Sequence, residues 1–169
     1  ILHCALGLVV FAAPPGPVRL SPAAAAAVVK EIEKDRADTQ AWLKSDPTSY
    51  LATIDRKDFA GKKTLSIGRA SDNDLRIDDP GIAPHHLRVT VEGDRFRVDA
   101  VDGSALFKVP GEGGAFKDVP SRTATVGPSS VQIGRFALRL SHQGFPGIIV
   151  FDPQSPHFRL YKGLKYFPP

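Results

Sequence analysis

Leu87-Arg88-Val89-Thr90-Val91-Glu92-Gly93-Asp94-Arg95-Phe96-Arg97-Val98-Asp99 is the stretch of the chain that decides the fold. Apolar and polar side chains alternate on both sides of Glu92-Gly93-Asp94. Successive side chains of a β-strand point to opposite faces, so this alternation gives each strand one apolar face. Gly93 supplies the positive φ that a tight hairpin requires. The stretch therefore predicts a β-hairpin with one face on a core and the other toward water.

Short alternating runs of the same kind, separated by turns, extend over most of the chain. The predicted strands are residues 64–68, 75–77, 86–91, 95–99, 105–109, 115–119, 123–126, 129–133, 136–140 and 147–151. About ten short strands with no convincing helix among them favour an all-β sandwich over a parallel α/β sheet.

A helix is predicted before the sandwich. Ser21-Pro22 is typical of a helix N-cap followed by proline at the first helical position, and Asp46-Pro47 ends the pattern. Its apolar stripe is narrow, so we expect this helix to pack on the domain or a neighbour through Trp42. A helix standing free in solvent is the alternative.

Four regions follow from these patterns: a signal-like apolar leader with a Pro-rich linker (1–20), an amphipathic helix (21–46), a sandwich (60–142) and a C-terminal segment that we expect to be truncated (143–169). The apolar run 1–13 is too short to span a bilayer as a helix. It fits the hydrophobic region of a secretory signal, so we expect an exported protein, periplasmic or extracellular, with a cytoplasmic one as the alternative.

Ile67-Gly68-Arg69, followed by Asp72-Asn73-Asp74-Leu75 and Ala83-Pro84-His85-His86, resembles the signature of the forkhead-associated (FHA) family. The resemblance implies an FHA/SMAD-like β-sandwich that binds phosphothreonine through the loops at one end. In that family a Ser-x-x-His follows the Gly-Arg pair, and a later Ser-x-Asn-Gly completes the phosphate contacts. The FHA-like pattern covers about residues 64–140.

This copy of the signature has lost two polar contacts that the resemblance implies. Ala83 replaces the serine, and no asparagine follows Ser104, where Ala105 and Leu106 stand. Hydrogen bonds to a charged group contribute about 1.5–3 kcal/mol each, so two losses could weaken binding of a phosphopeptide roughly a hundred- to ten-thousand-fold. Arg69 remains as a guanidinium that can donate a planar pair of hydrogen bonds to a phosphate; the alternative role of Arg69 is a surface ion pair with Asp72 or Asp74.

The candidate binding residues are accordingly those of the end-loop surface: Arg69, Asn73, Ala83, His86 and Ser104. The resemblance implies that His86 braces the loops and does not contact the ligand.

A second resemblance lies in the tail. Asp152-Pro153-Gln154-Ser155-Pro156 and Tyr166-Phe167-Pro168 resemble the middle of the bacterial domain of unknown function 1684 (DUF1684) family. Members of that family are exported proteins with a helix before the sandwich, which agrees with the leader and the helix here. The more distinctive half of that family's pattern would lie beyond residue 169.

Other chemistries have little support. The 22 cationic and 18 anionic side chains are interspersed, so no nucleic-acid footprint is indicated. Cys4 is the single cysteine, and His85 and His86 would point to opposite faces of a strand, so we expect no metal site and no cofactor. Asp78-Asp79-Pro80-Gly81 has the composition of a turn. No catalytic motif is present, so we expect no catalytic residues, and enzyme activity stays open.

The sequence therefore predicts a non-catalytic protein-interaction or scaffold module of an exported bacterial protein, with a protein or peptide partner and without phosphothreonine binding. One alternative is the N-terminal part of a hydrolase-like enzyme or small-ligand binder whose site lies downstream. The other is a working phosphopeptide-binding FHA domain. Composition and pattern do not predict the oligomeric state.

Overall fold

The computed structural model describes residues 20–168 of the 169-residue chain. The apolar run 1–13 and most of the linker predicted after it lie outside the described residues. Two compact units can be distinguished: residues 39–165 form the larger, and the described part of the smaller comprises residues 20–38 and 166–168. Among residues 20–168, no helix is both long and apolar enough to cross a membrane.

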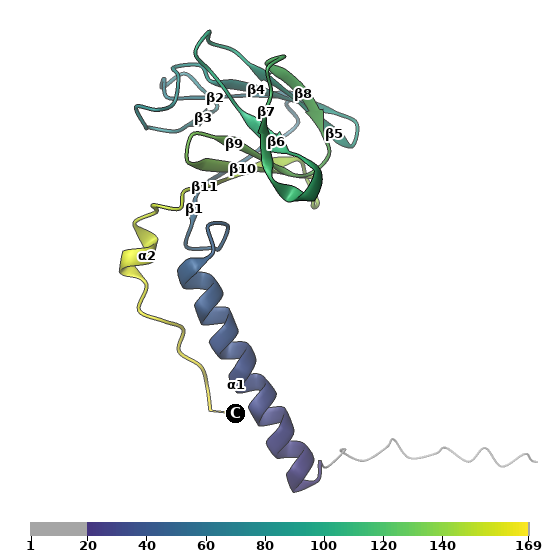
Figure 1. Ribbon diagram of the computed structural model, residues 1–169, viewed down its shortest axis with the longest axis vertical. Coiled ribbons are helices and arrows are strands. Elements are labelled where there is room, and N and C mark those ends of the chain that lie inside the picture. The colour runs from purple at the N-terminus through teal and green to yellow at the C-terminus, as the bar shows by residue number, and fades with distance from the viewer. Residues whose placement is uncertain (1–19, 169) are drawn as a thin grey trace, which may run out of the picture. The chain divides into compact units, whose positions relative to one another are not determined.

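The larger unit is a β-sandwich of two sheets that lie face to face (Figure 1). The five-stranded sheet has the order β3 (Leu75–Arg76), β2 (Thr64–Gly68), β4 (Leu87–Glu92), β5 (Arg95–Ala100) and β8 (Thr123–Val126). The six-stranded sheet has the order β1 (Thr53–Asp58), β11 (Gly147–Phe151), β10 (Phe136–Ser141), β9 (Ser130–Ile133), β6 (Lys108–Pro110) and β7 (Phe116–Asp118). All neighbouring strands are antiparallel except β2 and β3. The predicted all-β sandwich with a preceding helix is confirmed.

The hairpin that decided the prediction is β4–β5. Its register pairs Val91 with Phe96 and Glu92 with Arg95, and Gly93 at the turn has φ +64°. Val89 and Val98 face each other across the two strands and are fully buried.

The six-stranded sheet includes two strands outside the range 60–142 that the sequence predicted for the sandwich: β1 precedes this range and β11 follows it. β11 lies between β1 and β10, and its Ile148 and Val150 are fully buried. The sequence pattern predicted β11 as a strand but not β1. Five of the six residues of β1 are exposed and four are charged, because β1 is the edge of its sheet. Charged side chains are common on edge strands, where they discourage pairing with another chain.

The core lies between the sheets and is filled from both. Fully buried members include Leu65, Ile67, Val89, Phe96, Val98, Ile133, Leu138, Ile148 and Val150. Burying an aliphatic or aromatic side chain of this size contributes about 1.5–3 kcal/mol, so this layer is the main source of the sandwich's stability.

Helix α1 (Pro22–Ser45) begins and ends where the sequence predicts. The Ser21 Oγ accepts a hydrogen bond from the Ala24 N–H at 3.2 Å, which is the predicted N-cap. The expected anchor is wrong: Trp42 is 38% exposed and lies edge-on to the exposed Tyr50, whereas Leu43 is the buried residue of α1. Two short helices, η1 (Glu112–Gly114) and α2 (His157–Leu160), complete the described elements.

Within the smaller unit, Arg36 holds the last described residues. Its guanidinium carbon lies 4.9 Å from the centre of the Tyr166 ring, and its NH2 donates to the Phe167 carbonyl oxygen at 2.8 Å.

Candidate binding site

Three loops meet at one end of the sandwich: residues 69–74, 77–86 and 101–107. Main-chain hydrogen bonds join the first two, from the Arg69 N–H to the Ala83 oxygen at 3.0 Å and from the Ala70 N–H to the Pro84 oxygen at 3.1 Å. The His85 N–H donates to the Asp102 carboxylate at 2.9 Å and joins the third. The loops therefore form one continuous surface.

This surface contains a hollow of about 380 Å³. It is lined by Arg69, Pro80, Gly81, Ile82, Ala83, Pro84, His86 and Ser104. The structure thus brings together four of the five residues that the sequence singled out, from three loops that are well separated in the chain. The fifth, Asn73, is not part of the lining.

Arg69 presents its guanidinium to the hollow with one nitrogen already engaged. Its Nε donates to the Ile82 carbonyl oxygen at 3.3 Å. Among residues 20–168 it forms no ion pair with Asp72 or Asp74: Asp74 pairs with Lys62 at 2.6 Å, and Asp72 lies 3.9 Å from His85. The ion pair that was the alternative reading of Arg69 is therefore absent from the described residues, and its terminal nitrogens remain available to a ligand.

His86 is a brace. It is 4% exposed, its Nδ1 accepts from the Ala83 N–H at 3.0 Å, and its Nε2 lies 2.9 Å from the Leu106 oxygen. Since Nδ1 accepts, Nε2 carries the proton and donates to Leu106. Both ring nitrogens are used within the protein, so His86 fixes two loops and offers nothing to a ligand.

Asn73 joins two of the loops outside the lining of the hollow. Its amide nitrogen donates to the carbonyl oxygens of Ala70 and Pro84, each at 2.8 Å. Pro84 also packs against Gly68 so closely that a Cβ on Gly68 would lie 2.1 Å from the Pro84 oxygen. The glycine of the Gly-Arg pair and the asparagine together allow the two loops to approach each other.

Two further sets of side-chain contacts hold the loops of the site, and neither was apparent from the sequence. The first set comes from Arg122, whose NH1 donates to the Gly103 oxygen at 2.7 Å and whose NH2 donates to the Asp102 oxygen. These bonds hold the turn that presents the exposed Ser104. Arg122 lies in the left-handed backbone region, with φ 60°, which is uncommon for a residue with a side chain.

The second set of contacts is an ion network of Arg135, Asp152 and Asp79. Arg135 donates to both Asp152 oxygens, at 2.9 and 3.1 Å, and to Asp79, which in turn accepts from the Gly81 N–H at 2.8 Å. Burial alone would raise the pKa of Asp152. The hydrogen bonds from Arg135 and the Gln154 N–H, with the charge of Arg135, outweigh burial and lower that pKa below its ordinary value. The network ties the turn after β11 to the loop that lines the hollow.

The loss of two polar side chains that the resemblance implies is the other notable feature of these loops. Ala83, in the lining, stands where the resemblance implies a hydroxyl. Leu106, which lies outside the lining and is 66% exposed, stands where it implies an amide. The polar side-chain groups left to a ligand are therefore the Arg69 guanidinium and the Ser104 hydroxyl.

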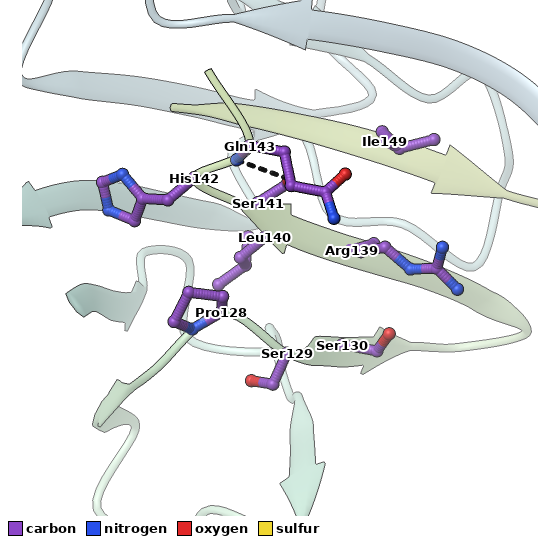
Figure 2. Close-up of a pocket in the computed structure, with 9 residues that line it drawn as sticks. All are labelled: Pro128, Ser129, Ser130, Arg139, Leu140, Ser141, His142, Gln143 and Ile149. Atoms are coloured by element: carbon purple, nitrogen blue, oxygen red, sulfur yellow. Dashed lines mark hydrogen bonds between the residues drawn. The ribbon is translucent and has the colours of Figure 1, made fainter. Parts of the chain in front are cut away.

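A second hollow, of about 520 Å³, lies at the opposite end of the sandwich, around the β8–β9 and β10–β11 turns (Figure 2). Three of its polar side chains are used locally: the Ser129 Oγ donates to the Gly127 oxygen, the Ser141 Oγ accepts from the Gln143 N–H, and Arg139 lies over the Phe151 ring. Figure 2 shows His142 pointing away from Arg139, so the two side chains do not converge on one ligand position. The hollow is larger but less organised, and we take the Arg69 hollow as the candidate site.

Within residues 20–168, no group of three or more His, Cys, Asp or Glu side chains could hold a metal ion.

Comparison with known proteins finds one family model and several solved structures to which the chain is similar. Residues 65–110 match the family model of the FHA domain. Among solved structures, the chain is similar to the FHA-2 domain of a Mycobacterium tuberculosis ABC transporter, with 20% identity and a TM-score of 0.39 over 54% of this chain and 79% of that one. It is also similar to the FHA domain of an Arabidopsis thaliana hypothetical protein, with 21% identity and a TM-score of 0.34 over 53% of this chain and 67% of that one. No curated protein shows significant similarity by sequence.

The matched segment runs from β2 to β6 and includes all three loops of the hollow. Over this segment the sandwich is similar to an FHA domain.

Proposed function

We propose that the chain binds a protein or peptide partner through the end-loop hollow, and that it does so without requiring phosphothreonine. The observation that carries the proposal is the composition of the hollow. Arg69, the one permanently charged residue among the described lining residues, is held in place by the Ile82 carbonyl. Ala83 in the lining and Leu106 outside it occupy the positions of two expected phosphate contacts.

The rival is a working phosphopeptide site. Ser104 lines the same hollow as Arg69 and offers a hydroxyl, which favours this rival. One solved structure to which the chain is similar, with 16% identity and a TM-score of 0.36 over 59% of this chain and 95% of that one, comes from a study of phosphothreonine-dependent FHA domain interactions. The two candidates differ in whether phosphate adds affinity.

The test compares two peptide pools, with phosphothreonine or threonine at the centre of otherwise random flanks. We expect the wild-type protein to retain both pools equally, and Arg69→Gln to retain less of each. The variant Ala83→Ser/Leu106→Asn restores the two polar groups, and we expect it to favour the phosphorylated pool by at least roughly tenfold. A wild-type preference of that size for phosphate, lost in Arg69→Gln, would establish the rival instead.

We also propose that the protein is exported and related to the domain of unknown function 1684 family. Support comes from the apolar run 1–13 and from Asp152-Pro153-Gln154-Ser155-Pro156. Residues 1–20 fused to a reporter that is active only outside the cytoplasm test the first part. An inactive reporter would favour the cytoplasmic alternative.

A further inference from the structure

We propose that a hollow on the larger unit, which we call the tail hollow, binds a small phosphate monoester whose ester group is apolar. Its walls are the last turn of α1 with the residues just after it, and the segment 153–159 that follows β11. The volume is about 410 Å³, within the range of small-molecule sites. All its lining residues belong to the unit 39–165, and none of them lines the end-loop hollow. The tail hollow is therefore distinct from the proposed partner surface.

The motif Asp152-Pro153-Gln154-Ser155-Pro156 builds one wall of the tail hollow. The Asp152 carboxylate accepts from the Gln154 N–H at 2.8 Å, and the Asp152 carbonyl oxygen accepts from the Ser155 N–H at 3.0 Å. Ser155 is 2% exposed, and its Oγ accepts from the His157 N–H at 3.3 Å. The aspartate and the serine are thus used within the turn, which holds Pro153 and Gln154 in the lining of the hollow.

The charge of the tail hollow is positive. Its charged lining residues are Lys44, from the last turn of α1, and Arg159, from α2, and no acidic side chain lines it. Among residues 20–168 neither cation forms an ion pair. Asp46 follows the lining in sequence, but its carboxylate accepts from the N–H and the hydroxyl of Thr48, both at 2.7 Å.

Two cations match the charge of a phosphate monoester, which is about −1.5 to −2 at pH 7. The Arg159 guanidinium can donate two parallel hydrogen bonds to phosphate oxygens, and the Lys44 ammonium acts as a point charge. The Gln154 amide adds neutral N–H donors to the same lining. A carboxylate, with one charge and two oxygens, would use fewer of these groups.

The remaining wall is apolar. Pro47, Pro153 and the half-buried Phe158 line the hollow together with the two cations. An aromatic or aliphatic group on the ester oxygen would pack on these side chains and remove apolar surface from water. The tail hollow therefore favours an aryl or alkyl phosphate over a phosphate with a polar ester group.

The experiment titrates the full chain with phenyl phosphate, methyl phosphate and benzoate, and follows backbone amide shifts by NMR. We expect the shifts to concentrate at residues 44–48 and 154–159. Phenyl phosphate should bind roughly fivefold more tightly than methyl phosphate, which lacks the ring, and than benzoate, which carries one charge.

Three variants test the groups that carry the proposal. Lys44→Gln and Arg159→Gln should each weaken phenyl phosphate binding by roughly fivefold, a modest factor because both side chains are exposed. Phe158→Ala should bring phenyl phosphate and methyl phosphate to equal affinity. The spectrum of each free variant checks that the sandwich is intact.

Matched controls remove cations elsewhere. Lys57→Gln in β1 and Arg88→Gln in β4 remove exposed cations, and Arg69→Gln removes the cation of the end-loop hollow. All three should preserve binding at residues 44–48 and 154–159.

Three outcomes would overturn the inference. One is the absence of phenyl phosphate shifts at these two segments, or shifts that appear at the end loops and vanish in Arg69→Gln. Another is unchanged affinity in both Lys44→Gln and Arg159→Gln. The third is a phosphotyrosine decapeptide that binds more tightly than phenyl phosphate, because the ligand would then be a protein segment and not a small molecule. None of these outcomes tests the proposed function, which depends on unphosphorylated peptides at the end loops.

Discussion

Gly68 sets how closely the two loops of the site can approach. A Cβ at this position would lie 2.1 Å from the Pro84 oxygen and 2.9 Å from the Asn73 amide nitrogen. The first obstacle is main chain, which itself accepts hydrogen bonds from Ala70 and Asn73 and cannot move without breaking them. Glycine is required at position 68 because there is no room for a Cβ.

We therefore expect Gly68→Ala to lower the free energy of unfolding by about 1–3 kcal/mol or more, as overpacking does in a well-packed core. Urea denaturation measures this as a lower midpoint. Gly103→Ala is the matched control, because nothing lies within 4 Å of a Cβ at that position and the backbone there requires no positive φ. Equal midpoints for the two variants would show that the Gly68–Pro84 contact is not a constraint.

At the scale of elements, the network of Arg135, Asp152 and Asp79 connects three parts of the fold: the β9–β10 hairpin, the turn after β11 and the β3–β4 loop. Asp152 is 7% exposed and the Arg135 side chain 37%, so the network lies at the margin of the interior. Its partial exposure limits its energy below that of a fully buried pair.

We expect Arg135→Gln to destabilise the protein by about 1–3 kcal/mol, because it leaves a buried carboxylate with fewer hydrogen bonds. Hydrogen exchange should increase at the Gly81 and Ile82 amides, which donate to Asp79. Arg88→Gln, which removes an arginine with no ion pair among the described residues, is the control. Unchanged exchange at these amides would mean that Arg135 does not support the loop.

At the scale of the whole molecule, acid should weaken the sandwich. The hydrogen bond and charge of Lys62, with the Ser66 hydrogen bonds, lower the pKa of Asp74, and the pKa of Asp152 is also lowered. A carboxyl whose pKa is lower in the folded than in the unfolded state contributes stability above its unfolded value, about 4. That contribution is lost as the pH falls through the folded pKa values.

The free energy of unfolding should therefore fall as the pH is lowered from about 5 to 2, and less steeply in Asp74→Asn/Asp152→Asn than in wild type. Urea titrations at a series of pH values measure the slope. The exposed Glu112→Gln serves as the control for removing a surface negative charge. Parallel curves for the double variant and wild type would contradict the assignment of these two carboxyls.

By itself the sequence determined the sandwich, the helix start at Ser21-Pro22 and the β4–β5 hairpin, because alternation, capping and turn chemistry act between neighbouring residues. It also indicated Arg69, Ala83, His86 and Ser104, through a resemblance carried by short motifs. It missed β1, since an edge strand rich in charge has no apolar alternation to detect.

Only the tertiary structure decided what these residues do. Arg69 is held by a carbonyl 13 positions away, His86 by one 20 positions away, and Asp79 meets Arg135 across 56 positions. Such contacts depend on which loops the two sheets bring to the same end. No local pattern encodes that meeting, because it is set by strand order and register over the whole chain.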